Sequence, residues 1–295
     1  MRAKRTDLAA EAREIFEENA VKKGTLQGVR MREYRRRGCD ITAVDITEQS
    51  AAAALQKPVG HYLTVDLRSE DGERFFMAVR CVAEELRRML PPLGENPVLV
   101  VGLGNRGITP DAVGPLVVEN ILVTRHLKET LPGEFSAFTP VCALAAGVLG
   151  TTGVESAEIV RGLAERIKPA CIIAVDALVS RRMERLCKTV QISDAGIVPG
   201  SGVGNHRSAL TEEVLHRPVL ALGVPTVIEA ATLAADLLEE QGLSTEEPLP
   251  ATGGIVTTRD IDQQVRELSR ILACGINLAL QPKLSLEDLM ALMGQ

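Results

Sequence analysis

Two aspartates, Asp111 and Asp176, are the residues of this sequence best placed to do chemistry. Asp111 follows the apolar run PVLVVGLGN, and Asp176 lies near the end of the apolar run ACIIAVDAL. Such β-branched runs are typical of buried parallel strands, and open α/β sheets bind ligands at the carboxyl ends of these strands. Two carboxylates brought together there repel each other, so one keeps its proton and the pair supplies an acid and a base. The pattern therefore predicts a hydrolytic site.

A purely structural role is the simpler interpretation for either aspartate alone. Asp111 would then cap a helix beginning near Ala112, and Asp176 would make a hydrogen bond at its strand end. Two aspartates in matching positions, beside two glycine-rich loops and the polar turn GTTGVES at residues 150–156, favour a shared site instead. We therefore expect both to be catalytic.

The first glycine-rich loop, GLGNRG at residues 102–107, matches the dinucleotide-binding pattern GxGxxG after a strand. In that fold a helix starts within the motif and the next strand ends in an acidic residue. Here Ile108, Thr109 and Pro110 prolong the turn, and the next apolar run, VCALAAGVLG, ends without a carboxylate. A tight turn with Pro110 at the first helical position is therefore favoured over nucleotide binding.

The second glycine-rich loop, DAGIVPGSGVGNHR at residues 194–207, has amides that could hold a peptide backbone or an oxyanion. A plain glycine-rich crossover explains its spacing equally well. From the two loops and the 150–156 turn, the expected substrate-binding or oxyanion residues are Gly104, Asn105, Thr152, Gly200, Ser201 and Gly202.

Other catalytic chemistries lack their signatures. Ser201 lies outside the GxSxG pattern, and none of the four histidines lies at a spacing from Ser201 that indicates a catalytic pair. The histidines form no HExxH motif, and the six cysteines show no CxxC spacing. The sequence therefore predicts neither a Ser-His-Asp triad nor a local metal site, and no cofactor is expected.

Composition narrows the class of protein further. The 295 residues carry a net charge of −6 and include no Trp, two Tyr and five Phe. Dispersed basic residues and scarce aromatics disfavour direct binding of nucleic acid. The charged N-terminus lacks the apolar segment of a secretory signal. We therefore expect a cytoplasmic enzyme with reduced cysteines and no membrane contact.

Alternating apolar runs and amphipathic segments predict an α/β fold with a doubly wound, mostly parallel sheet flanked by helices. The chain is expected to form a single domain over residues 1–295, with a small peripheral lobe within 21–95. Most of 21–59 looks irregular and polar, and 242–254 looks like a linker. Strands are expected at 60–68, from 98, and at 141–150, 171–177, 189–193 and 218–223. Helices are expected at 6–20, within 72–90, and at 113–131, 155–167, 180–186 and 260–281.

Five blocks of the sequence together resemble the germination protease family, the spore endopeptidases of peptidase family A25. The blocks are VVGLGNRGITPDAVGP, GTTGVESAEIVRG, IIAVDALVSRR, QISDAGIVPGSGVGNH and LGVPTVIEA, in this order. The similarity extends to RTDLAAEA, KPVGHYLTVDL and GIVTTRDIDQQVRELSRILACGINLAL. It therefore covers nearly the whole chain.

This resemblance implies a fold similar to that of hydrogenase maturation endopeptidases and a homotetramer in the cytoplasm of the spore core. It implies substrates that are small acid-soluble spore proteins, cut on the carboxyl side of a glutamate during germination. The family's two essential aspartates correspond to Asp111 and Asp176. Whether a metal takes part stays open at this point. The alternatives are a metal-assisted or maturation-type peptidase of the same fold, and a non-enzymatic nucleotide-binding module.

Three features depart from the family pattern. Family zymogens carry an acidic propeptide before the RTDLA block, whereas only residues 1–4 precede it here, so we expect activity without removal of a long propeptide. The segment between VPTVIEA and GIVTTRD is shorter than usual. Glu229 stands where Asp is common, which keeps the charge on a longer side chain.

Overall fold

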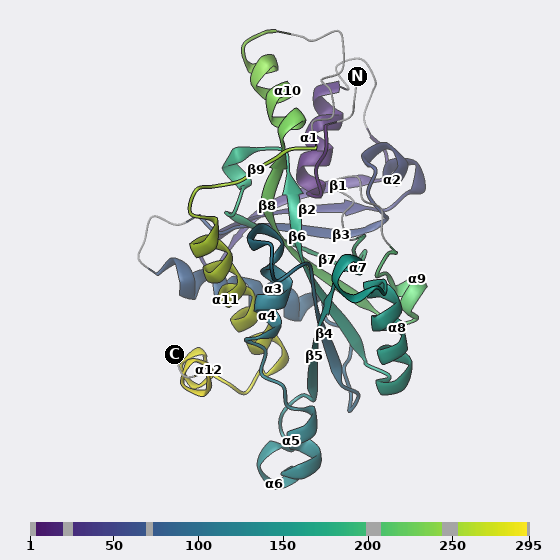
Figure 1. Ribbon diagram of the computed structural model, residues 1–295, viewed down its shortest axis with the longest axis vertical. Coiled ribbons are helices and arrows are strands. Elements are labelled where there is room, and N and C mark those ends of the chain that lie inside the picture. Colours follow the sequence, from purple (N-terminus) through teal and green to yellow (C-terminus); the bar gives the residue numbers. More distant parts are fainter. Residues whose placement is uncertain (1–3, 20–25, 69–72, 199–207, 244–252, 294–295) are drawn as a thin grey trace.

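A central mixed β-sheet organises the computed structural model, which describes residues 4–19, 26–68, 73–198, 208–243 and 253–293 (Figure 1). Within these residues the sheet has nine strands in the order β1-β2-β3-β7-β8-β6-β4-β5, with β9 paired to β8. The strands are β1 (Val29–Arg36), β2 (Cys39–Ile46), β3 (Gly60–Asp66), β4 (Val98–Leu103), β5 (Val141–Gly147), β6 (Cys171–Ser180), β7 (Thr189–Ser193), β8 (Val219–Glu229) and β9 (Ile255–Val256).

The predicted α/β class is confirmed, and the parallel part of the sheet comprises β8, β6, β4 and β5. The remaining strands are antiparallel to their neighbours. Strands β1 and β2 form a hairpin where the sequence looked irregular, because β1 is an arginine-rich edge strand with most of its positions exposed. Residues within 21–95 thus extend the same sheet through the pairing of β3 with β7.

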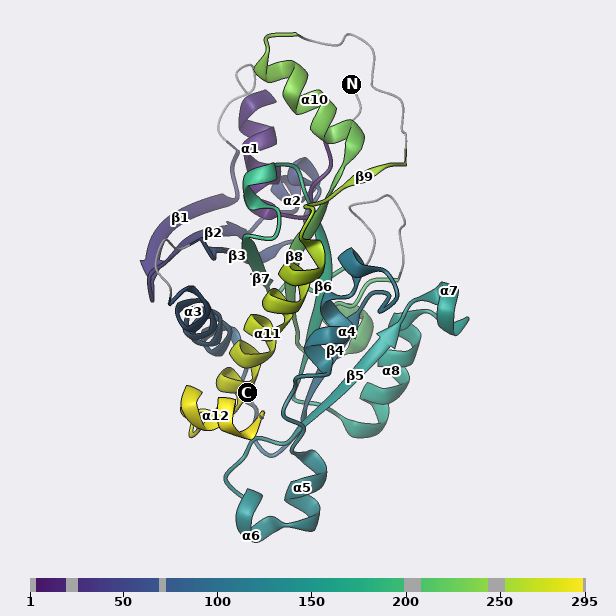
Figure 2. The same ribbon diagram turned by 60° about the vertical axis from the view of Figure 1, so that its left-hand side comes forward.

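Helices cover both faces of the sheet (Figure 2). The largest hydrophobic cluster unites the sheet with α3, α4, α11 and α12 on one face. A second cluster involves α8 and α9, and a third involves α1 and α2. The helices are α1 (Ala9–Asn19), α2 (Gln49–Leu55), α3 (Arg74–Met89), α4 (Val113–Val118), α5 (Arg125–Thr130), α6 (Pro132–Phe135), α7 (Leu149–Thr152), α8 (Ser156–Ile167), α9 (Glu212–Leu215), α10 (Ala230–Glu240), α11 (Ile261–Leu280) and α12 (Leu286–Leu292).

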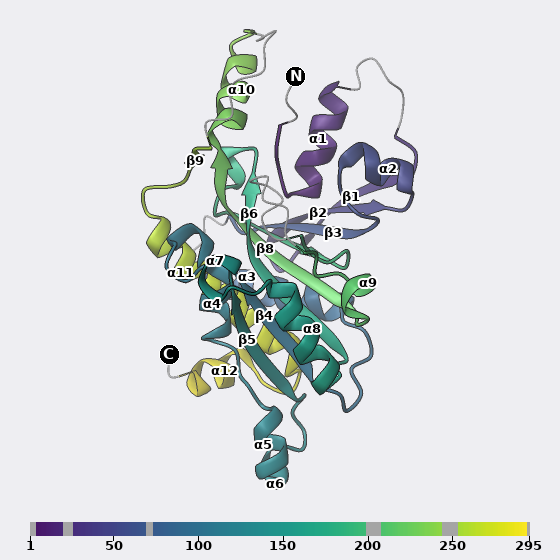
Figure 3. The ribbon, with the colours of Figure 1, turned by 45° about the vertical axis from the view of Figure 1, so that its right-hand side comes forward.

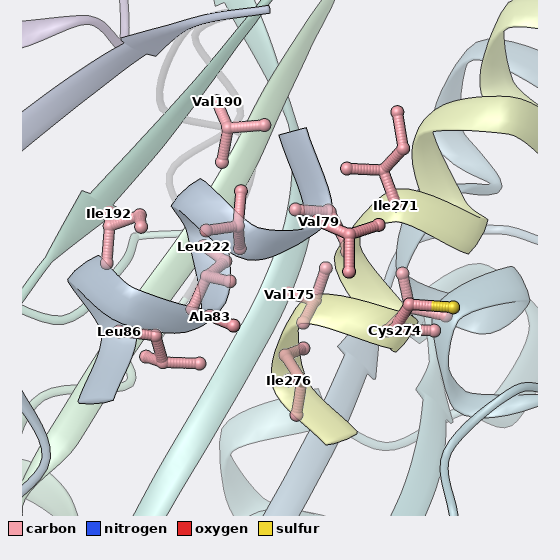
Figure 4. Close-up of a cluster of buried hydrophobic side chains, with 14 of the residues drawn as sticks. Val79, Ala83, Leu86, Val175, Val190, Ile192, Leu222, Ile271, Cys274 and Ile276 are labelled. Atoms are coloured by element: carbon pink, nitrogen blue, oxygen red, sulfur yellow. The ribbon is translucent and has the colours of Figure 1, made fainter. Parts of the chain in front are cut away.

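The main core lies where α3 and α11 pack side by side on the sheet (Figure 4). In α3, Val79, Ala83 and Leu86 recur at helical spacing and point to one face. They meet Ile271 of α11 and Leu222 of β8 within the same cluster. Burying this apolar stripe fixes both helices on one side of the parallel strands.

Two predicted helices differ from the structure. A helix was expected at 180–186, but β6 continues to Ser180, and only Met183–Arg185 forms a 3₁₀ turn. Pairing of Val179 and Ser180 with β8 overrides the local pattern. The helix expected at 113–131 is divided into α4 and α5, and Leu122 between them donates its amide to the Asn277 side chain.

Candidate active site

Asp111 ends a 3₁₀ turn, Thr109–Asp111, that follows β4. Its Oδ2 accepts a hydrogen bond from the amide of Asn105 at 2.7 Å. The Asn105 side chain in turn accepts the amide of Gly107 at 2.9 Å. The Asp111 carboxylate therefore holds the loop and the turn together. The predicted loop residue Asn105 is in direct contact with this carboxylate.

Gly104 allows this closure. Its φ is +105°, and a Cβ atom there would lie 2.1 Å from the carbonyl oxygen of Asp111. A side chain would thus be strained by conformation and would collide with the backbone of Asp111. The sequence pattern placed Gly104 at the site, and the structure shows that it lets two backbone segments approach each other.

Asp176 lies within β6, as the predicted strand at 171–177 implies, and only 5% of its surface is exposed. Its Oδ1 accepts the amide of Ala177 at 2.9 Å. Pairing between β4 and β6 stops at Gly102 and Val175. Asp176 is therefore the first residue of β6 without a partner on β4. Strand β6 runs beyond the predicted end at residue 177 because it stays paired with β8 as far as Ser180.

Strands β4 and β6 are parallel neighbours (Figure 3). Asp111 ends the turn that follows β4, and Asp176 lies in β6 just beyond the last residue paired with β4. The turn that ends at Asp111 packs against β6 and β8. Gly114 of α4 brings this segment close, since a Cβ atom there would lie 2.6 Å from the carbonyl oxygen of Val175. This edge can present two carboxyl groups to one substrate, as acid and base chemistry requires.

A row of polar residues crosses the sheet from Asp176. Direct cross-strand partners link Asp176 to Gly223, then to Gln191, Thr64 and Thr42. Paired residues share a face, and the row runs on the face that carries the two smaller hydrophobic clusters. Asp176, Gln191 and Thr64 in this row are buried polar residues, and the sequence analysis did not identify the row. The sequence feature that could have indicated this row is Gln191, the single Gln within TVQIS.

The other predicted loop residues have different positions. Thr152 ends α7, which follows β5, and its hydroxyl lies within hydrogen-bonding distance of the carbonyl oxygens of Val148 and Val154. It therefore stabilises its own turn. Gly200, Ser201 and Gly202 lie outside the described residues.

The GLGNRG loop lacks the geometry of a dinucleotide site. Helix α4 begins at Val113, well after the glycines of residues 102–107. The amide of Asn105 is already donated to the Asp111 carboxylate, so it is not available to a pyrophosphate. The loop positions an acidic side chain instead.

Residues near the N-terminus adjoin the strand of Asp176, which sequence reasoning missed. Asp7 hydrogen-bonds to Val179 of β6, and Glu11 accepts the amides of Arg181 and Arg182. Lys57 donates to the carbonyl of Thr6 at 2.9 Å. Burial lowers the pKa of Lys57, against the opposing influence of Asp7 and Glu11. No local sequence signal connects residue 7 with residue 179.

Metal-ligating clusters and membrane-spanning helices are both absent from the part of the chain that the structure describes. His, Cys, Asp and Glu side chains there form no group of three or more that could hold a metal ion. No helix in the same ranges is both long and apolar enough to span a membrane.

Comparisons with known proteins agree with the sequence pattern. The family model described as germination protease, peptidase A25, matches residues 9–241. A germination protease of Clostridium tetani is 40% identical, with 97% of this chain and 98% of the relative covered. One from Clostridium perfringens is 41% identical, covering 97% of both chains. One from Caldanaerobacter subterraneus subsp. tengcongensis is 40% identical, covering 98% of both.

Proposed function

Because this chain belongs to the germination protease family, we propose that it is an endopeptidase that degrades small acid-soluble spore proteins during germination. We place it in the cytoplasm of the spore core, as a homotetramer. The observation that supports the proposal is the parallel pairing of β4 with β6, because Asp176 lies in β6 and Asp111 ends the turn that follows β4.

The proposed chemistry uses the two carboxyl groups in different states. One aspartate, ionised, takes a proton from water as the water attacks the scissile carbonyl. The other, protonated, donates a hydrogen bond to the carbonyl oxygen and later a proton to the leaving amine. Close carboxyl groups favour such a singly protonated pair. Amides of a glycine-rich loop would stabilise the developing oxyanion.

The proposed specificity is cleavage on the carboxyl side of glutamate. Desolvating that carboxylate is costly, so the pocket must offer a guanidinium, an ammonium or several amides. A peptide series varied only at this position tests the claim. Efficiency should fall when glutamate becomes alanine and more strongly when it becomes lysine. Equal rates for glutamate and alanine would overturn it.

Metal assistance is the competing mechanism, and a chelator separates it from the aspartate pair. Dialysis against a chelator, with metal analysis of the protein before and after, should leave the cleavage rate unchanged if the two aspartates suffice. Loss of activity that returns with an added divalent cation would replace the proposed mechanism with a metal-assisted one.

A further inference from the structure

From Asp176 onward, strand β6 has no pairing with β4 along one of its edges. Its pairing with β4 ends at Val175, whereas its pairing with β8 continues to Ser180. Backbone N–H and C=O groups on that edge then need other partners, because buried polar groups without partners are costly. Another segment of the chain must therefore replace β4.

Three alternate amides, two along this edge and one just past the end of β6, each donate to a carboxylate. Ala177 donates to Asp176 at 2.9 Å, Val179 to Asp7 at 2.8 Å and Arg181 to Glu11 at 2.7 Å. Alternate residues of a strand direct their amides to the same side. Asp7 and Glu11 thus continue the series that the Asp176 carboxylate begins.

Asp7 holds this edge at two points. Its side chain accepts the amide of Val179, and its own amide donates to the carbonyl of Val179 at 2.8 Å. The paired bonds imitate those of a neighbouring strand. Val179 is thereby fixed close to Asp176 in the same strand.

The segment around Asp7 is itself anchored to the polar row. The Gln191 side chain accepts the amide of Ala9 at 2.8 Å and donates to the carbonyl of Asp7 at 3.2 Å. Gln191 pairs with Gly223, the direct partner of Asp176. Asp7 is therefore connected to Asp176 by two routes, one through Val179 in the same strand and one through Gln191 and Gly223. Helix α1 lies beside the end of β6 (Figure 1).

We propose that Asp7 is a positioning residue for Asp176, replacing β4 along the open edge of β6 and fixing the orientation of the catalytic carboxyl. This inference rests on the proposed catalytic function of Asp176. Loss of the hydrogen bonds between Asp7 and Val179 leaves the substrate-binding surface in place but lets Asp176 shift. The effect is therefore expected on kcat and not on KM.

The test compares three variants on one glutamate-containing peptide. Asp7→Leu removes the acceptor and should lower kcat about 100-fold, as small displacements of catalytic groups do, with KM nearly unchanged. Asp7→Asn keeps an oxygen that can accept the Val179 amide and should restore most of kcat. Glu14→Leu is the matched control, because Glu14 lies on α1 but bonds the side chains of Arg185 and Arg182. It should lower thermal stability and leave kcat unchanged.

A purely structural role predicts a different pattern. If kcat fell equally in Asp7→Leu and Glu14→Leu, in step with lost stability, the inference would be wrong. Should Asp7→Leu fail to fold, Asp7→Glu is the second variant, because it keeps the charge but lengthens the side chain. An unchanged kcat in Asp7→Glu would contradict the positioning role of Asp7. Asp176→Asn provides the reference. If it stays fully active, the proposed function itself fails, whereas an inactive Asp176→Asn beside a fully active Asp7→Leu refutes only the role of Asp7.

Discussion

Gly104 decides at the residue scale whether the Asp111 turn can form. Its φ is positive, and a Cβ atom at this position would lie 2.1 Å from the Asp111 carbonyl oxygen, so there is no room for a side chain. The sequence pattern identified Gly104, Asn105 and Asp111 because they are close together in the chain. It could not identify Asp7, whose partner Val179 is distant in the sequence and adjacent only in the fold.

Replacing Gly104 should damage both the turn and catalysis. Gly104→Ala is expected to cost about 1–3 kcal/mol of unfolding free energy, because the residue is strained and the Asp111 backbone must move. Peptide cleavage should also fall sharply. Gly153→Ala is the control, since Gly153 has φ +73° but an added Cβ there meets nothing within 4 Å. Equal loss of activity in both variants would contradict a specific role for Gly104.

At the scale of elements, the close packing of α3 on α11 holds the parallel strands from one side. Gly275 of α11 faces Val82 of α3, and a Cβ atom there would lie 2.7 Å from Val82 Cγ1. Apolar periodicity predicted both helices, because their buried positions recur at regular spacing. The same pattern did not predict the end of β6, where pairing with β8 decides the conformation.

Gly275→Ala should force the two helices apart or push Val82 from its preferred position. The expected cost is about 1–3 kcal/mol of unfolding free energy, as for other overpacked cores. Urea denaturation measures it. Gly162→Ala in α8, where nothing lies within 4 Å of the added Cβ, should instead be neutral or stabilising. Equal midpoints for the Gly275 variant and the unmodified protein would contradict this packing.

For the molecule as a whole, a group of charges around the buried Arg181 and Asp236 joins three segments distant in sequence. Asp236 of α10 pairs with Arg181 at 2.7 Å and with Lys4 at 2.6 Å. Arg181 also pairs with Glu18 of α1 at 2.8 Å. Burial alone would raise the pKa of Asp236, but Arg181 and Lys4 outweigh it and lower that pKa. The cluster therefore ties α1 and α10 to the end of β6.

Asp236→Ala should lower the unfolding free energy by about 3–5 kcal/mol near pH 7, because it removes the buried carboxylate that pairs with the buried Arg181. A lowered pKa stabilises the fold above the unfolded value near 3.9, and that contribution disappears as pH falls through the folded value. The difference between the two proteins should therefore shrink below about pH 4. Glu119→Ala, which breaks an exposed pair with Arg106, should change little. A pH-independent difference would contradict the account.

The sequence predicted the α/β class because β-branched runs and amphipathic segments alternate along the chain. It did not predict that β1, β2, β3 and β7 join the sheet antiparallel, since strand pairing depends on contacts between distant segments. The same limit applies to the site. Both aspartates carried local signals, whereas Gln191, Lys57 and Glu11 acquire their neighbours only on folding.

The central claim is that Asp111 and Asp176 act as a pair, and the most direct measurement is cleavage by Asp111→Asn and Asp176→Asn. Each variant loses one member of the acid and base pair, so each should lose at least about 100-fold in kcat on a purified small acid-soluble spore protein. Circular dichroism and thermal unfolding should show that both remain folded. Turnover by either folded variant at the rate of the unmodified protein would contradict the account.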